Sequence, residues 1–487
     1  MLLLLSPLLS VAGWTSPADA APACTIYWTG GAGDHAWTNT SNWSTNRLSD
    51  GTDSAPLPGE TARVCVADDP VSRGAVIDGN HDDVYVDSIR FPAVADSLTV
   101  KGTPRDGFGN FGIGPRCCDL PAVKRASTIG SLTIDGRTVT TLQPLTVAGP
   151  VRIDAEGMFK SAGWDGTYKT RFRSEVNVTK GVIDGDVILL GHTTFGSLVA
   201  GGGVLNRGTM TGAPFCILWD ANGDYPKVHP SVINEGTITG SGEPDSYCAL
   251  DMVANRGTIR ATGGEFYIED SPNLVNHVLT GGRYEVTAGV IGFKDPVIDN
   301  RAILRSRGEG RLVRYGGSPM LQYLERNSGT LDLANDVTDD VDLVNTGTVV
   351  LRSATLAARS YTQTEGSTRL LARSRIAADA HVSGGSVGGE GNGFVDGDLT
   401  LGPDATTKVQ VRPTGVDGLR VSGTASLDGR LLVDNAGSFE PGPAASYRFL
   451  AAGSRTGAFS SVDGETMTLR TYGVEYQADG ARLITSP

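Results

Sequence analysis

The sequence has few aromatic residues, few methionines and little positive charge. Aromatic residues make up 7% of the 487 residues, and there are only six methionines. Lys and Arg number 41 against 54 Asp and Glu. Binding to nucleic acid or to an anionic membrane surface needs clustered positive charge, so neither partner is predicted. Beyond the first residues, no apolar stretch is long enough to cross a bilayer, so no membrane span is expected either.

Metal-binding spacing is also missing. No C-x-x-C pair occurs and the six histidines are scattered, which argues against a zinc site; no cofactor is predicted. An even number of cysteines is typical of disulfide-bonded proteins in an oxidising compartment, although the pairing cannot be deduced from spacing alone. The six are Cys24, Cys65, Cys117, Cys118, Cys216 and Cys248.

The first residues, MLLLLSPLLSVAGWTSPADAAPAC, have the pattern of a secretory signal. A short apolar run is followed by Ala18 and Ala20 in an A-x-A arrangement, although no basic segment precedes it. The run is too short to span a bilayer. We therefore predict a signal peptide over residues 1–20 and a secreted, extracellular protein.

A short motif recurs through the middle of the chain. VINEGTITG, ending at Gly240, is echoed by VLNRGTMTG and by VANRGTIRATGG, each with a hydrophobic pair, an Asn, a Gly and a Thr. The Asn recurs on average every 23 residues or so, a period typical of solenoids. The aligned residues are Asn206, Asn234, Asn255, Asn276, Asn300, Asn327 and Asn345.

Each repeat contains short alternating runs with β-branched residues and frequent glycine, and none has helical apolar spacing. This pattern predicts an all-β fold, a right-handed parallel β-helix whose short strands stack in parallel. We assign the Asn and Gly to structural turns, where both tolerate left-handed backbone angles, and expect the asparagines to hydrogen-bond along the stack. The predicted turn residues are Asn206, Asn234, Asn255, Asn327 and Asn345.

Both ends depart from the repeat. We predict an N-terminal cap segment over residues 21–83, a parallel β-helix with loop insertions over 84–412, and a C-terminal β-rich cap over 413–487. The insertions fall at 103–126, 211–230 and 241–251. Cys216 and Cys248 lie in the last two, about one coil apart, so their pairing is our first expectation; Cys24 with Cys65 is the second.

The N-terminal segment YWTGGAGDHAWTNTSNWS contains a W-x-G…G…W…NW arrangement formed by Trp28, Gly30, Gly33, Trp37 and Asn42-Trp43. Together with PLPGETARV and the C-terminal stretch beginning DGLRVSGTASLDGR, it resembles secreted bacterial β-helix surface proteins of the autotransporter-passenger-like and filamentous-haemagglutinin-like families. The resemblance covers nearly the whole chain. It implies display outside the cell and adhesion or polysaccharide contact.

Acid–base catalysis on a sugar requires two positioned carboxylates. The best candidates for an enzyme are Glu265 and Glu269, in GEFYIED, with Asp270. A solvated turn explains these residues equally well, because a catalytic partner would come from a neighbouring coil.

The stretch WDANGDY offers two further hypotheses. Asp220, Asn222 and Asp224 alternate like the first ligands of a calcium loop, but the glycine comes too early and no closing Glu follows. An Asx-rich turn fits better. Trp219 and Tyr225 lie on an insertion that the repeat does not require, and exposed aromatic rings stack on sugars, so these two are the predicted glycan-binding residues.

From these observations we predict a monomeric, non-enzymatic structural or adhesion-type protein that contacts polysaccharide or cell-surface glycans. The alternative is an extracellular polysaccharide lyase or glycoside hydrolase on the same scaffold.

Overall fold

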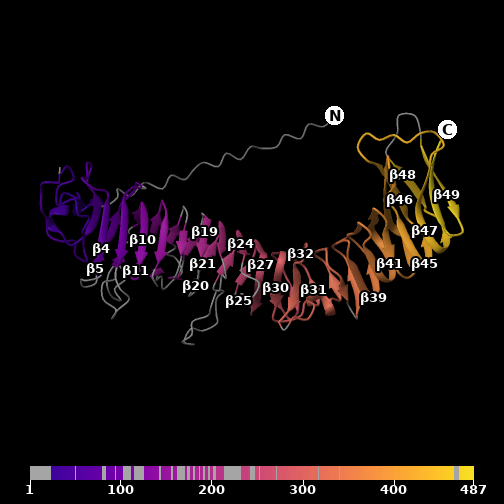
Figure 1. Ribbon diagram of the computed structural model, residues 1–487, viewed down its shortest axis with the longest axis horizontal. Helices are drawn as coiled ribbons and strands as arrows, with labels where there is room; N and C mark the ends of the chain where they lie inside the picture. Colours follow the sequence, from indigo (N-terminus) through magenta and orange to yellow (C-terminus); the bar gives the residue numbers. More distant parts are fainter. Residues whose placement is uncertain are drawn as a thin grey trace, which may run out of the picture.

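The computed structural model describes residues 23–486, except for 50, 79–83, 94, 102–110, 114–125, 142–143, 155–156, 162–169, 173–175, 179–180, 186, 190–191, 196–197, 201–203, 213–231, 242–246, 252, 270, 316, 339–340 and 465–470. These residues form strands and turns, with two short 3-10 helices among them, η1 (Thr40–Asn42) and η2 (Met320–Tyr323). The strands follow one another along an elongated, curved array from the N-terminal to the C-terminal residues (Figure 1). The predicted all-β class is confirmed.

Strands three places apart in chain order lie side by side and run parallel over most of the N-terminal half. For example, β4 (Gly74–Asp78) pairs with β7 (Ser97–Lys101), and β5 (Val84–Val86) pairs with β8 (Phe111–Ile113). The chain thus passes three faces in turn and returns to the first face one strand further along. Parallel pairing of this kind was the central expectation from the repeat.

The first sheet contains, in spatial order, β2 (Trp43–Ser44), β1 (Ile26–Trp28), β3 (Arg63–Val66), β6 (Ser88–Arg90), β9 (Ser127–Ile129), β12 (Leu145–Val147), β15 (Thr170–Phe172), β18 (Val187–Leu189), β21 (Val204–Asn206), β23 (Val232–Asn234) and β26 (Val253–Asn255). The second begins with β4, β7, β10 (Ser131–Asp135), β13 (Val151–Asp154), β16 (Val176–Val178), β19 (His192–Phe195), β22 (Thr209–Gly212) and β24 (Thr237–Ser241). The third contains β5, β8, β11 (Thr138–Thr141), β14 (Gly157–Ser161), β17 (Gly181–Gly185) and β20 (Leu198–Ala200).

β27 (Thr258–Glu269) is a single long strand that serves two faces. The first half of β27 pairs with β24 and its second half with β25 (Tyr247–Asp251), with a shift in register between them. The following strands are β28 (Leu274–Val275), β29 (Val278–Leu279), β30 (Arg283–Phe293), β31 (Asp299–Asn300), β32 (Ile303–Ser306), β33 (Arg311–Arg314), β34 (Arg326–Asn327), β35 (Thr330–Leu333), β36 (Val337–Thr338), β37 (Asp342–Asn345), β38 (Thr348–Arg352) and β39 (Thr355–Gln363).

The C-terminal strands are β40 (Ser367–Leu371), β41 (Arg375–Glu390), β42 (Gly393–Val395), β43 (Leu399–Arg412), β44 (Gly415–Val416), β45 (Leu419–Leu427), β46 (Arg430–Asn435), β47 (Ser446–Gly457), β48 (Ser461–Gly464), β49 (Tyr472–Gln477) and β50 (Gly480–Thr485). Parallel pairing continues as far as β46 with β48, and β49 and β50 then pair antiparallel. Parallel pairs also occur before residue 84, as in β1 with β3. Parallel pairing therefore also occurs outside residues 84–412, on both sides.

Buried asparagines close the strands of the first sheet. Asn206 donates from its side-chain amide to Oδ1 of Asn234 at 2.7 Å, and Asn234 donates to Oδ1 of Asn255 at 2.8 Å. All three are at most 1% exposed. Their amides also reach backbone carbonyls of the next strand, so each buried polar group has a partner, as burial requires.

The row resumes further along the stack. Asn300, Asn327 and Asn345 form the same side-chain chain at 2.8 Å per step, and Asn345 passes it on to Gln363. The alignment of Asn276 with these residues is wrong. Leu279 occupies the position paired with Asn300, whereas Asn276 lies in the turn between β28 and β29 with a φ of 50°. We refer to the two runs as the asparagine ladder.

The repeated glycine has a different reason from the one that the sequence suggested. Neither Asn234 nor Gly236 has a positive φ. Instead, a Cβ at Gly236 would collide with the carbonyl oxygen of Gly208, and one at Gly347 would collide with that of Gly329. Glycine is thus required here by the close approach of successive backbones rather than by a left-handed turn.

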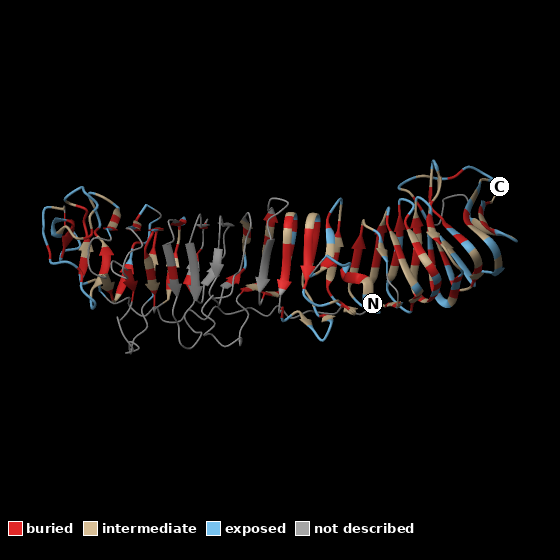
Figure 2. Cartoon of the chain, turned by 60° about the horizontal axis from the view of Figure 1, so that its bottom comes forward, coloured by how far each residue is buried: buried red, intermediate tan, exposed pale blue. Residues whose placement is uncertain are grey.

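Alternation along each strand separates the core from the surface. Inward residues such as Met210, Ile238 and Ile259 occupy one register row and are each 1% exposed. Figure 2 shows buried residues recurring along the strands while exposed ones collect at turns and at the two ends. Each such side chain contributes about 1.5–3 kcal/mol to stability through burial. Together these side chains form a continuous apolar core inside the stack.

The N-terminal tryptophans form part of that core. Trp28, Trp37 and Trp43 are 0–1% exposed, and the rings of Trp37 and Trp43 meet edge-to-face at 4.6 Å. Asn42 is buried beside them and donates to Oδ1 of Asp34 at 2.6 Å. The W-x-G…NW motif therefore folds the first segment onto the end of the stack. The predicted Cys24–Cys65 disulfide is confirmed, with Cα atoms 5.9 Å apart.

Candidate functional site

A charged row runs along the outward face of the second sheet. Arg260 on β27 is paired in register with Glu285 on β30, then with Arg305 on β32 and Asp332 on β35. The residue before each of them, such as Tyr284 before Glu285, points into the core and is 0–1% exposed. Side chains alternate across a strand, so these four charged residues all face outward, one strand apart.

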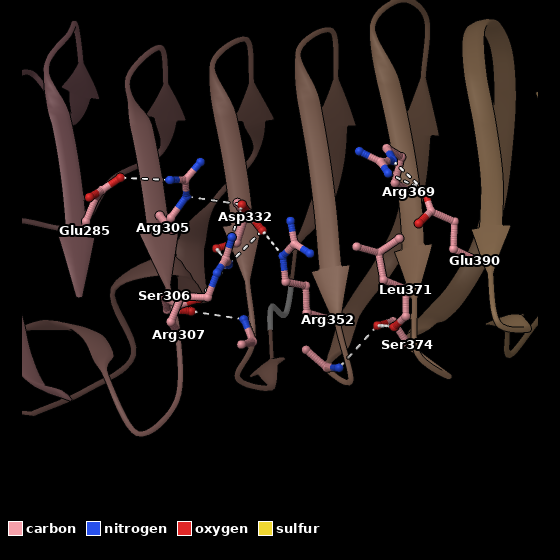
Figure 3. Close-up of polar contacts among 12 residues, drawn as sticks. Glu285, Arg305, Ser306, Arg307, Asp332, Arg352, Arg369, Leu371, Ser374 and Glu390 are labelled. Carbon is pink, nitrogen blue, oxygen red and sulfur yellow. Dashed lines mark hydrogen bonds and ion pairs between the residues drawn. The ribbon is translucent and has the colours of Figure 1, made fainter. Parts of the chain in front are cut away.

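The charges in this row interlock. Arg260 Nη2 lies 2.7 Å from Glu285 Oε2, and the other oxygen of Glu285 lies 2.9 Å from Arg305 Nη1. Arg305 reaches in the other direction with Nε, 3.2 Å from Asp332 Oδ2. Figure 3 shows Arg305 between the two carboxylates, with Arg352 approaching Asp332 from the next strand.

Three more arginines complete the cluster. Arg283 Nε lies 3.5 Å from Glu285 Oε1. Arg307 donates from Nη1 to Oδ1 of Asp332 at 2.8 Å, and Arg352 donates from Nε to the same oxygen at 2.9 Å. We call the set the arginine patch; it consists of Arg260, Arg283, Arg305, Arg307, Arg352, Glu285 and Asp332.

The arginine patch carries excess positive charge on an acidic protein. Five guanidinium groups surround two carboxylates, whereas the whole chain has a net charge of −13. Glu285 and Asp332 are 5% and 4% exposed, but the arginine side chains keep between 28% and 44% of their surface exposed. The anions are therefore enclosed and the cations face solvent.

The arginines hold both carboxylates in the charged form. Burial raises the pKa of Glu285, but the hydrogen bond and charge of Arg260, with the charges of Arg283 and Arg305, outweigh it and leave the pKa below its usual value. Burial likewise raises the pKa of Asp332, and the bonds from Arg307 and Arg352 bring it below normal. Neither group can therefore serve as a general acid near neutral pH.

The same face continues into a hollow. In register after Asp332 come Val350, Arg369, Gly388 and Lys408. A cavity of about 310 Å³ opens around Gly388. Its lining includes Ser367, Arg369, Ser386, Gly388, Lys408 and Gln410. We call it the Gly388 hollow.

A second cavity lies on another face, where η2 contacts both β33 and β36. It measures about 360 Å³ and has the apolar side chains of Leu312, Leu321 and Leu333 in its wall. Two exposed tyrosines, Tyr315 and Tyr323, belong to the same loop region, at 54% and 40% exposure. The lining also includes the charged residues Glu309, Arg311 and Asp336, so both apolar and polar groups face this cavity.

Of the carboxylates proposed for an enzyme, the structure describes the side chain of Glu265 alone. It is half-buried and accepts a hydrogen bond from the Tyr267 hydroxyl at 3.2 Å. Burial, with the charge of Glu265, raises the pKa of Tyr267. Glu269 ends β27, but its side chain lies outside the described residues, as does Asp270. Their catalytic role stays a prediction.

The predicted glycan and calcium residues lie on a segment outside the described residues, as does Cys216; they are Trp219, Tyr225, Asp220, Asn222 and Asp224. Cys248 lies on β25, in register with Phe266, and its pairing with Cys216 stays a prediction. Within the described residues, no group of three or more His, Cys, Asp or Glu side chains is arranged to hold a metal ion.

Among the described residues, no helix is long and apolar enough to cross a membrane. Comparison with known proteins identifies no relative: no protein family, curated protein or solved structure matches this chain.

The arginine patch was missed in the sequence because its members are scattered over five strands. A signal for part of it exists. Arg260, Arg305 and Asp332 each follow their ladder asparagine by five residues, as aligned repeats would show. Glu285 belongs to the repeat whose ladder position is Leu279, so counting from Asn276 leads to Gly281 instead.

Proposed function

We propose that this protein is an extracellular right-handed parallel β-helix that acts as a non-enzymatic scaffold and contacts an acidic polysaccharide through the arginine patch. The excess of exposed guanidinium groups in that patch is the observation that carries the proposal.

The β-helix assignment rests on the pairing of strands three places apart and on the asparagine ladder, which needs successive coils in register. Connections between parallel strands of one sheet are almost always right-handed, which gives the sense of winding. The extracellular location is supported by the Cys24–Cys65 disulfide, since such bonds persist in oxidising compartments, and by the signal-like first residues.

The ligand class follows from the geometry of the arginines. Parallel strands are about 4.8 Å apart, so the row presents charged groups at regular intervals along the stack of strands. A guanidinium group has five N–H donors in a planar fork that suits carboxylate and sulfate oxygens. An extended polymer with spaced anionic groups could therefore lie along the row and contact several arginines together.

A polysaccharide fits the patch better than nucleic acid does. Three excess charges are few compared with what a dense phosphate backbone requires, and the net charge of −13 repels such a backbone elsewhere. A sugar polymer with one carboxylate per unit or fewer carries a charge density nearer to that of the patch. Its hydroxyl groups can also bond to the Thr and Ser residues in the neighbouring register row, Thr330, Thr348 and Ser367.

The patch does not support catalysis. Glu285 and Asp332 are ionised and their oxygens are occupied by arginine donors, so neither offers a proton or a free base to a sugar. An acid–base pair needs one carboxyl group that is protonated and one that is ionised. Here the surroundings lower the pKa of both carboxyl groups, so both are ionised.

The test is binding of the full chain to an immobilised polyuronate, with a neutral polysaccharide of similar length as reference. The variant Arg260→Gln/Arg352→Gln removes two charges and leaves each carboxylate with two arginines. The control Arg47→Gln/Arg359→Gln removes two charges from exposed surface ion pairs elsewhere. We expect about a tenfold loss of affinity in the first variant only, with a weaker dependence on salt.

The ligand assignment would be refuted if both variants bound the polyuronate with equal affinity, or if the protein showed no preference for the acidic over the neutral polymer. Release of reducing or unsaturated sugar ends during the same incubation would show that the protein is an enzyme and would direct attention to Glu265 and Glu269.

A further inference from the structure

The Gly388 hollow lies on the same outward face as the arginine patch and has no role in the asparagine ladder or the core. Gly388 stands in the register row between Arg369 and Lys408, so one side chain is missing from an otherwise filled row. A cavity of about 310 Å³ has Gly388 in its lining. Its position places it in the path of any polymer that follows the row.

The glycine is required by packing, which makes the hollow a fixed feature. A Cβ at Gly388 would lie 2.8 Å from the carbonyl oxygen of Lys408 and 3.3 Å from its Cβ. The neighbouring strand would have to shift to admit any other residue. The depression is thus held open by the close approach of β41 and β43.

One cation in the lining of the hollow, Lys408, forms no ion pair among the described residues. Arg369 is bound to Glu390, and Asp417 in the wall is bound to Arg412. Within the described part of the chain, Lys408 forms no ion pair or hydrogen bond, and its side chain is exposed. Because an ammonium group provides three donors, it can bind one anionic group of a ligand.

The rest of the lining suits hydroxyl groups. Ser367 and Ser386 lie in adjacent positions of the next register row, and Gln410 and Asp434 face each other across β43 and β46. Asp434 forms no ion pair among the described residues, and a carboxylate accepts hydrogen bonds but donates none when charged. A ligand that fills the hollow should therefore bring O–H donors toward Asp434, with its negative charge confined to the group that meets Lys408.

We propose that the Gly388 hollow is a subsite for one uronic acid unit of the acidic polysaccharide, a proposal that rests on the function proposed above. The sugar carboxylate binds Lys408, and ring hydroxyls bond to Ser386, Gln410 and Asp434. A densely sulfated unit fits less well, because its additional anions would face Glu390, Asp417 and Asp434.

The subsite is tested with a uronate trisaccharide, the corresponding neutral trisaccharide and a sulfated one, titrated into the full chain by calorimetry. Lys408→Met removes the charge and keeps the length of the side chain; Lys101→Met, on an exposed position of β7, is the matched control. We expect the uronate trisaccharide to bind best and Lys408→Met alone to weaken it by about tenfold.

Two outcomes separate this inference from the broader function. Polyuronate binding that depends on Arg260 and Arg352 but not on Lys408 would overturn the subsite and leave the proposed function in place. If the uronate trisaccharide binds in a way that depends on Lys408, but no polymer binds through the arginine patch, the proposed function is overturned and the subsite remains. Tightest binding of the sulfated trisaccharide would overturn the carboxylate assignment, and Ser386→Tyr, which fills the hollow, should abolish binding in every case where the subsite is real.

Discussion

Asn327 donates from its side-chain amide to Oδ1 of Asn345 at 2.8 Å, in a place that solvent does not reach at either residue. Asn327 also accepts a hydrogen bond from Asn300 on its other side. One residue thus satisfies two buried neighbours. The ladder links coils through side chains in addition to the backbone bonds of the sheet, and its loss would leave several polar groups buried without partners.

We predict that Asn327→Ala destabilises the protein by roughly 1–3 kcal/mol for each buried polar group left unsatisfied. Hydrogen exchange should quicken in β34 and β37 before it changes at the two ends, because contacts in a stacked array are local. Ser328→Ala, at the exposed neighbouring position, serves as the control. Unchanged exchange at β37 would mean that the ladder contributes little.

Glycine substitutions should separate close approach from turn geometry. Gly347→Ala places a methyl group against the carbonyl of Gly329, and we expect it to cost about 1–3 kcal/mol. Gly59→Ala meets no atom within 4 Å and has no positive φ, so its effect should be close to zero. Denaturation midpoints of the two variants measure the difference, and equal midpoints would contradict the steric explanation.

How far the sequence predicted the molecule depends on the kind of contact. An Asn and a Gly equivalent to Asn234 and Gly236 recur in most repeats, so stacking imposes a pattern that the sequence reveals. The contacts of Glu285 are with arginines, most of them on other strands. Its place in the repeat is hidden because Leu279, and not an Asn, occupies the ladder position of that repeat. The hollow at Gly388 is lined by residues of several strands that lie far apart in the sequence, which no spacing rule indicates. Hence the all-β class and its parallel strands were visible in the sequence and the charged face was not.

The Cys24–Cys65 bond should stabilise the N-terminal segment specifically. It closes a loop with a sequence separation of 41, and the loop-entropy relation gives about 4 kcal/mol for a loop of that size. We expect the double variant Cys24→Ser/Cys65→Ser to become sensitive to proteolysis near β1 and β3 while β40 and β41 stay protected. Equal cleavage of variant and parent protein would show that the packed tryptophans hold the segment without the bond.

The ion pairs of Asp332 predict a stability loss in acid. Its pKa in the folded protein is below the usual value, although burial acts in the opposite direction, because Arg307 and Arg352 stabilise the charged form. For a carboxyl group with a lowered folded pKa, the stabilisation is complete above the unfolded pKa of about 4 and disappears as the pH falls through the folded value. Asp332→Asn should therefore lower stability at pH 7 by about 2 kcal/mol.

Asp332→Asn and the parent protein should become equally stable in acid, where the parent carboxyl group is also neutral. Denaturant unfolding of both proteins between pH 7 and pH 2 measures the converging curves. Asp342→Asn, which removes an exposed partner of Arg359, is the matched control and should change stability by less than about 1 kcal/mol throughout. Parallel curves for Asp332→Asn and the parent would show that Asp332 titrates alike in the folded and unfolded chains, and the enclosure of this carboxylate by arginines would then have no energetic consequence.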